Sequence, residues 1–140
     1  MLEQLKTIAN LATEMWNTGD LSRFDEVYAT NFINHDPSLP DVMDYESFKA
    51  HIAAMHKGMP DHKVVVQDEI AENDKIASRW VTTATHTGPL GGISPTGKKL
   101  TYTGLTIYRF EQGKIVEAWW NYDKLGFLQQ LGIIPSMQAT

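Results

Sequence analysis

The sequence contains no cysteine, which excludes disulfide bonds, thiolate nucleophiles and thiolate-bound metals. No apolar run approaches the roughly 20 residues that a membrane-spanning helix requires, and residues 1–6 have neither the basic nor the apolar stretch of a signal peptide. Lysine and arginine are not clustered, and the formal net charge is −5. These absences predict a cytoplasmic protein that binds neither membranes nor nucleic acid.

The composition is that of an ordinary globular protein. The chain has 140 residues, of which 42% are hydrophobic and 21% are charged. A chain of this length can bury about two thirds of its unfolded surface around one core. We therefore expect a single domain over residues 1–140.

The first part of the chain has the three-and-four spacing of apolar residues that is typical of amphipathic helices. The spacing predicts a helix over 2–17, a short second helix from Asp20 to Tyr28, and a third that is capped by Asp41 or Asp44 and ends at Gly58. Residues 31–41 are expected to be irregular.

After Pro60 the sequence is rich in valine, threonine and tryptophan, which favours strands. We expect a hairpin of 62–70 and 76–87, further strands at 99–110 and 114–122, and a closing helix at 124–131. The glycine- and proline-rich segment 88–97 is expected to form a loop at a pocket rim. Helices followed by an antiparallel meander indicate an α+β fold and disfavour a Rossmann-type fold, which needs alternating strands and helices.

Several segments resemble SnoaL-like polyketide cyclases, in the order and spacing of that family. The most specific are 113–119, Asp123 and 128–132, and further matches are 16–20, 32–37, 59–61, 85–88 and 95–98. The family belongs to the nuclear transport factor 2-like superfamily. The resemblance implies a homodimer in which three N-terminal helices and a curved antiparallel sheet form a cone around a pocket. The ligand would be a small apolar or polycyclic molecule.

Fold transfers across such a superfamily better than reaction does. Some SnoaL-like members perform an intramolecular aldol cyclisation without a cofactor. Other members of the superfamily are lyases, isomerases and epoxide hydrolases, and some are non-catalytic binding or dimerisation modules. The leading hypothesis is a cofactor-independent cyclase, lyase or isomerase that acts on a carbonyl compound. The alternative is a non-catalytic small-molecule-binding or dimerisation module.

Asp123 matches the acid/base aspartate of the family. Alternation along the last strand would place it on one face with Trp119 and Asn121, and we expect this face to be the pocket wall. The opposite face, with Trp120 and Tyr122, would serve as core or dimer contact. Asp123 can instead cap the helix at 124–131.

Two histidines are further catalytic candidates. His86 matches a strand histidine of the family and could polarise a carbonyl group, or it could be a half-buried histidine bonded to the backbone. His35 falls where the family brings a loop beside the pocket mouth, although the following Asp36 and Pro37 alone would explain a turn.

The remaining candidates are substrate-binding residues. Trp16 and His51 lie on the inward stripes of their helices, where an aromatic residue is more often simply core. Trp80, with Trp119, could line a pocket for a flat ligand. His56 and His62 are expected to be exposed and without function.

Metal and epoxide-hydrolase interpretations are less favoured. His35, His51, His86 and Asp123 are suitable metal ligands, but they lack the spacing of a zinc site, and we expect no metal. An epoxide hydrolase of related fold needs an arginine between two aspartates. Arg79, the arginine next to Trp80, alternates away from the predicted pocket face.

Overall fold

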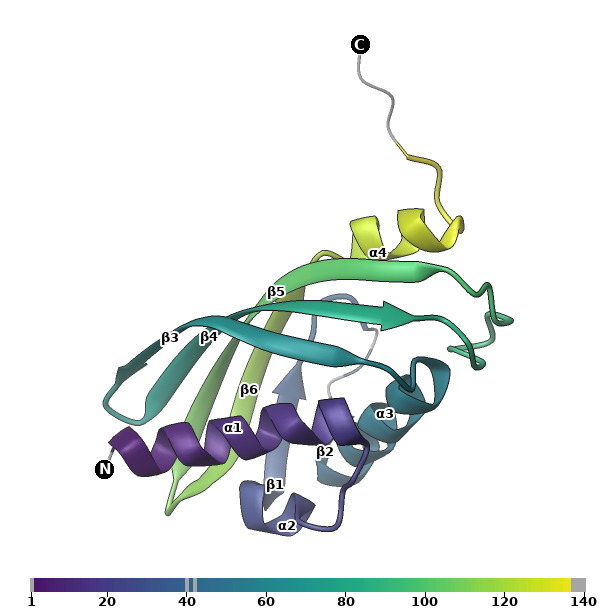
Figure 1. The fold of residues 1–140 in the computed structure, drawn as a ribbon. Helices are drawn as coiled ribbons and strands as arrows, with labels where there is room; N and C mark the ends of the chain where they lie inside the picture. Colours follow the sequence, from purple (N-terminus) through teal and green to yellow (C-terminus); the bar gives the residue numbers. More distant parts are fainter. Residues whose placement is uncertain (1, 40, 42, 137–140) are drawn as a thin grey trace.

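The computed structural model describes residues 2–39, 41 and 43–136. The elements in chain order are α1 (Leu2–Thr18), α2 (Phe24–Val27), β1 (Tyr28–His35), β2 (Met43–Asp44), α3 (Tyr45–Gly58), β3 (Lys63–Glu72), β4 (Lys75–Thr85), β5 (Lys99–Glu111), β6 (Lys114–Tyr122) and α4 (Lys124–Leu131). The strands form one sheet in the order β2-β1-β6-β5-β4-β3 (Figure 1). Neighbouring strands are antiparallel except β1 and β6, which are parallel. The predicted α+β class is confirmed.

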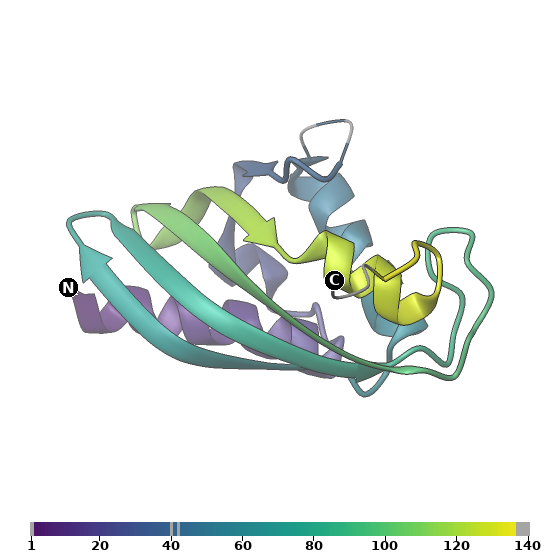
Figure 2. The same ribbon diagram turned by 90° about the horizontal axis from the view of Figure 1, so that it is seen from above.

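The helices and the curved sheet enclose the main core. In both views α1 runs along β3 and β4, while α3 covers the end of the sheet near β1 (Figures 1 and 2). The buried side of α1 carries Leu5, Ala9, Ala12, Met15 and Trp16, the stripe expected from its spacing. Within the described residues, no helix has the length and apolarity needed to cross a bilayer.

Caps fix the limits of two helices. Asp44, rather than Asp41, begins α3: its carboxylate accepts from the Ser47 backbone N–H at 2.9 Å, and the Ser47 hydroxyl accepts from the Asp44 backbone N–H at 2.9 Å. This reciprocal pair satisfies two N–H groups that a helix start leaves free. Gly132 ends α4 with a left-handed φ of 82°.

The segment after α1 differs from the prediction. The second helix is only the four residues of α2, and the strand β1 occupies much of the segment that we expected to be irregular. The strand forms because β1 pairs with β6, about 80 residues away. Local spacing does not reveal a partner so distant in the chain.

A β-bulge changes which side chains of β6 face the core. Phe110 pairs with Ile115 but Arg109 pairs with Glu117, so Val116 is an extra residue on β6. Ile115 and Ala118, three positions apart, therefore both belong to the main core. The simple alternation used in the sequence prediction fails at this point.

Candidate functional site

A partly enclosed cavity lies between α1, α3 and the inner face of the sheet. Its lining residues are Thr13, Trp16, Asn34, Asp36, Phe48, His51, Met55, His62, Val64, Val66, Ser78, Trp80, Thr82, Tyr102, Tyr108, Trp120 and Tyr122. The centre of a water molecule can move through about 50 Å³ of it.

Three tryptophans form much of the cavity wall. The indole of Trp120 lies between those of Trp16 and Trp80, with ring centroids 5.6 and 5.9 Å away. Trp80 is held in place because its Nε1–H donates to Thr106 Oγ1 at 2.9 Å. A Cβ atom on Gly104 would overlap the Trp80 indole, so the glycine allows this ring to lie against β5.

Two histidines line the cavity, and burial keeps both of them neutral at pH 7. Burial lowers the pKa of His51 below its usual 6.5, while the charge of nearby Asp36 acts in the opposite direction. Burial, followed by the neighbouring His56, lowers the pKa of His62 from 6.5 to about 4. The cavity therefore offers uncharged imidazoles.

The buried position of His62 corrects the sequence prediction, which placed it in solvent. Its backbone N–H donates to the Met59 carbonyl at 3.0 Å, and the resulting turn carries the side chain under α1. There its ring stacks on Trp16 at 5.7 Å between centroids, and its Nε2 lies 3.2 Å from Tyr102 Oη. No local pattern predicts this contact, because α1, the turn and β5 are far apart in the chain.

The end of β1 reaches the cavity through residues other than the expected one. Asn34 and Asp36 line the cavity, whereas His35 between them points to the other face of the sheet. Asn34 Oδ1 is buried and has no hydrogen-bond partner. The prediction of a segment beside the pocket was useful, but it selected the wrong side chain.

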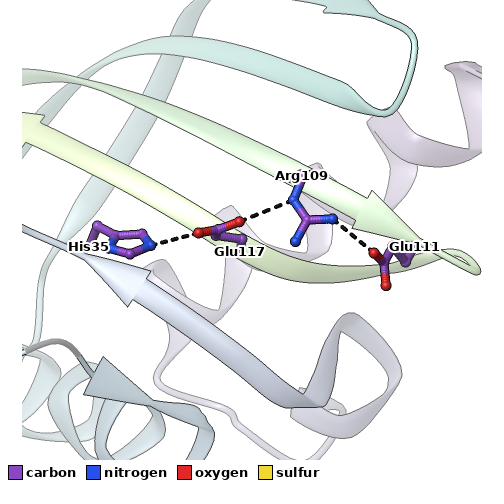
Figure 3. Close-up of polar contacts among 4 residues, drawn as sticks. All are labelled: His35, Arg109, Glu111 and Glu117. Carbon is purple, nitrogen blue, oxygen red and sulfur yellow. Dashed lines mark hydrogen bonds and ion pairs between the residues drawn. The ribbon is translucent and has the colours of Figure 1, made fainter.

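His35 belongs to a polar network on the outer face of the sheet (Figure 3). Its Nε2 lies 2.7 Å from Glu117 Oε2. Arg109 contacts two carboxylates: its Nε lies 3.1 Å from Glu117 Oε1, and its Nη1 lies 2.9 Å from Glu111 Oε1. The hydrogen bonds from His35 and Arg109 lower the pKa of Glu117. The ring of His35 stacks on Trp119 with centroids 5.5 Å apart. Neither His35 nor Trp119 lines the cavity.

His86 fixes a loop instead of lining the cavity. The side chain is fully buried, and its Nδ1 accepts from the Thr96 backbone N–H at 3.2 Å. Its backbone pairs with Lys98 and Gly97. The structure has the backbone-bonded histidine that the sequence offered as the alternative, but the side chain is fully buried and not half-buried. Residues 88–97 do not line the cavity, so the rim prediction is wrong.

Asp123 lies outside the cavity and caps α4. Its Oδ1 accepts from the Gly126 backbone N–H at 2.9 Å, which confirms the capping alternative. With Asn121 and Leu105 it borders a shallow open depression on the other side of the sheet. The predicted pocket face of β6 is therefore wrong: Trp120 and Tyr122 face the cavity, and Trp119 and Asn121 face away.

Three of the predicted site residues, Trp16, His51 and Trp80, do line the cavity. Their helical and strand periodicity was sufficient to place them. Among the described residues, no group of three metal-binding side chains is present. Arg79 pairs with Asp68 on the exposed side of the sheet, away from the cavity, and so cannot serve the epoxide-hydrolase arrangement.

Comparison with known proteins identifies the family. The model for SnoaL-like polyketide cyclases matches residues 6–131, and the chain belongs to this family. Among solved structures it is similar to IdmH from Streptomyces antibioticus, a candidate polyketide cyclase: identity is 30%, 92% of this chain and 99% of that chain are covered, and the TM-score is 0.81. No curated protein matches the sequence significantly.

A second similar structure is AclR from Streptomyces galilaeus, a candidate hydroxylase, with 25% identity, 99% and 87% coverage and a TM-score of 0.87. A third, a candidate polyketide cyclase from Acidithiobacillus ferrooxidans, has 29% identity, 92% and 94% coverage and a TM-score of 0.80. The predicted nuclear transport factor 2-like fold is confirmed.

Proposed function

We propose that this chain is an enzyme that moves a proton on a small, largely apolar carbonyl compound, in a cyclase, lyase or isomerase reaction. The proposal involves only side chains of the chain itself and no cofactor. The observation that carries it is an aromatic-rich cavity in which an uncharged histidine, His51, lies near the carboxylate of Asp36.

His51 takes the role that the sequence prediction gave to Asp123. A neutral imidazole can accept a proton, and its lowered pKa ensures that the neutral form is present at pH 7. Once protonated, the imidazolium is stabilised by the charge of Asp36. Edge contact with Trp16, at 6.0 Å between ring centroids, supports the ring from the side of α1.

The proposed reaction begins at a carbon next to the substrate carbonyl. His51 takes a proton from this carbon, and the C–H electron pair moves toward the carbonyl oxygen to give an enolate. In a cyclisation, the enolate carbon then forms a bond to a second carbonyl carbon of the same molecule. The oxygen of that second carbonyl receives the proton from His51, so the side chain ends as it began.

The size of the cavity limits the substrate. A cavity of about 150 Å³ binds benzene, and the space available here is about 50 Å³. A ring-containing substrate therefore requires lining side chains to move, and the flexible Met55 can do so at small cost. The space favours a single-ring compound over the polycyclic one expected from the sequence.

A second candidate function is binding without catalysis. It is favoured by one observation: Asp123, His35 and His86, which match the family or its pocket segments, all lie outside the cavity. The cavity would then hold a ligand through its aromatic wall alone.

Hydrogen–deuterium exchange of acetophenone in D₂O, followed by NMR, separates these two functions, because it detects proton removal beside a carbonyl whatever step follows. We expect the protein to accelerate exchange and His51→Gln to reduce the enzymatic rate by about 10²-fold or more. His56→Gln, on the same helix but outside the cavity, is the matched control. Binding without faster exchange would support the binding module and contradict the enzyme.

We also infer a homodimer that forms through the outer face of the sheet. The residues first expected there, Trp120 and Tyr122, face the cavity instead. The outer face still exposes large apolar side chains, including Ile33, Leu105 and Ile107. Apolar side chains grouped on one face of a sheet support association with a second copy.

A further inference from the structure

One part of the cavity wall concentrates uncharged polar groups. The register of β4 and β5 pairs Thr82 directly with Tyr102, and both side chains line the cavity. The turn before β3 brings His62 to the same place, with its Nε2 3.2 Å from Tyr102 Oη. Trp80 and Phe127 pack edge-on against the Tyr102 ring at 6.0 and 5.1 Å, so the surroundings are apolar.

The hydrogen bonds in this group are incomplete. Thr82 is 1% exposed, and its hydroxyl has no partner. Tyr102 is also buried, and its hydroxyl lies 3.2 Å from His62 Nε2. The Thr82 hydroxyl is near enough to act against the rise that burial causes in the pKa of Tyr102, but the two hydroxyls do not meet in hydrogen-bond geometry. A buried hydroxyl without a partner destabilises the fold, and a ligand atom that accepts its proton removes this cost.

We propose that Thr82 and Tyr102 form the subsite for the carbonyl oxygen of the ligand, and that His62 positions Tyr102. With its proton on Nε2, neutral His62 donates to Tyr102 Oη, which leaves the tyrosine hydroxyl proton for the ligand. The two hydroxyls then donate to the two lone pairs of one carbonyl oxygen. This inference rests on the proposed function for the substrate class, but it concerns binding and not proton transfer.

The same group selects an uncharged carbonyl over a carboxylate. Burial of an ionised carboxylate is costly unless a cation pairs with it. His62 cannot supply that cation near neutral pH, because burial holds its pKa at about 4. The lysine and arginine side chains do not line the cavity. The subsite therefore fits a ketone, aldehyde, ester or thioester, and not a free acid.

Two probes of matched shape test the subsite: acetophenone, and α-methylstyrene, in which a CH₂ group replaces the carbonyl oxygen. NMR titration of ¹⁵N-labelled protein gives both dissociation constants, and their ratio measures the preference for the oxygen. We expect Tyr102→Phe to lower this preference about 2- to 13-fold, the range of one hydrogen bond. Thr82→Val, which keeps the side-chain shape, should lower it similarly. Wild-type protein should bind benzoate at least about tenfold more weakly than acetophenone.

Tyr108→Phe is the matched control. Tyr108 also lines the cavity from β5, but it lies six residues, roughly 20 Å, farther along the strand. The preference should stay within about twofold in this variant. His62→Gln, which retains a donor, should preserve more of the preference than His62→Leu, as expected of a positioning residue.

An unchanged preference in both Tyr102→Phe and Thr82→Val would overturn the subsite, as would an equal loss in Tyr108→Phe. Failure of both probes to bind wild-type protein at millimolar concentration would also overturn it. If Tyr102→Phe does not fold, Thr82→Val decides the question. If wild-type protein does not accelerate acetophenone exchange, but Tyr102→Phe and Thr82→Val lose the preference for the carbonyl oxygen as expected, the proposed enzyme is contradicted and the subsite is retained.

Discussion

Burial of neutral His62 should make the stability of this protein depend on pH. The pKa of His62 is about 4 in the folded chain, against 6.5 for an unperturbed histidine. As pH falls from about 6.5 to about 4, the unfolded chain takes up a proton at this residue that the folded chain does not. The free energy of unfolding therefore falls with decreasing pH, and the contribution is fully present only above about pH 6.5.

The size of the effect follows from the pKa difference. A shift of one pKa unit corresponds to about 1.4 kcal/mol, so His62 should account for about 2 kcal/mol of stability lost between pH 7 and pH 4.5. His62→Gln removes the titrating group and keeps a polar side chain. Between pH 7 and pH 4.5 the unfolding free energy of the wild type should therefore fall by about 2 kcal/mol more than that of His62→Gln.

Urea unfolding followed by tryptophan fluorescence at several pH values provides the measurement. His56→Gln is the control. It removes the charge of His56, which is the secondary cause of the lowered His62 pKa, but it leaves the burial of His62, which is the main cause, unchanged. This control should retain most of the pH dependence. A wild-type minus His62→Gln difference that stays constant within about 0.5 kcal/mol from pH 7 to 4.5 would refute the reasoning.

Three further predictions concern the site and the outer face. Asp123→Asn should keep at least half of any acetophenone exchange rate, because the side chain caps α4 and an amide can still cap; a loss of tenfold or more would return Asp123 to the chemistry. Gly104→Ala should push the Trp80 ring toward the cavity, which should lower the unfolding free energy by about 1–3 kcal/mol in urea titrations and weaken acetophenone binding. Unchanged binding would show that β5 moves instead of the Trp80 ring. Ile107→Glu should yield a monomer by light scattering, whereas Leu125→Glu, a change at a somewhat more exposed position on α4, should not; a dimer in both would place the interface elsewhere.

Much of the fold followed from local periodicity. The bounds of β6 and α4 agree with the prediction, and α1 and α3 differ from it by a residue or so. These elements bury one stripe or one face, so their apolar spacing is visible in the sequence. Trp16, His51 and Trp80 could be assigned to the cavity for the same reason.

The sequence by itself determined the class of fold, the family and the aromatic character of the cavity. Only the tertiary structure decided which groups of its polar lining meet. The β-bulge at Val116 breaks the alternation on β6, and β1 exists as a strand because of its distant parallel partner. His62 reaches Tyr102 through a turn and a strand register, neither of which has a local signal. Periodicity reports the burial of one element at a time, whereas a site depends on the register between elements.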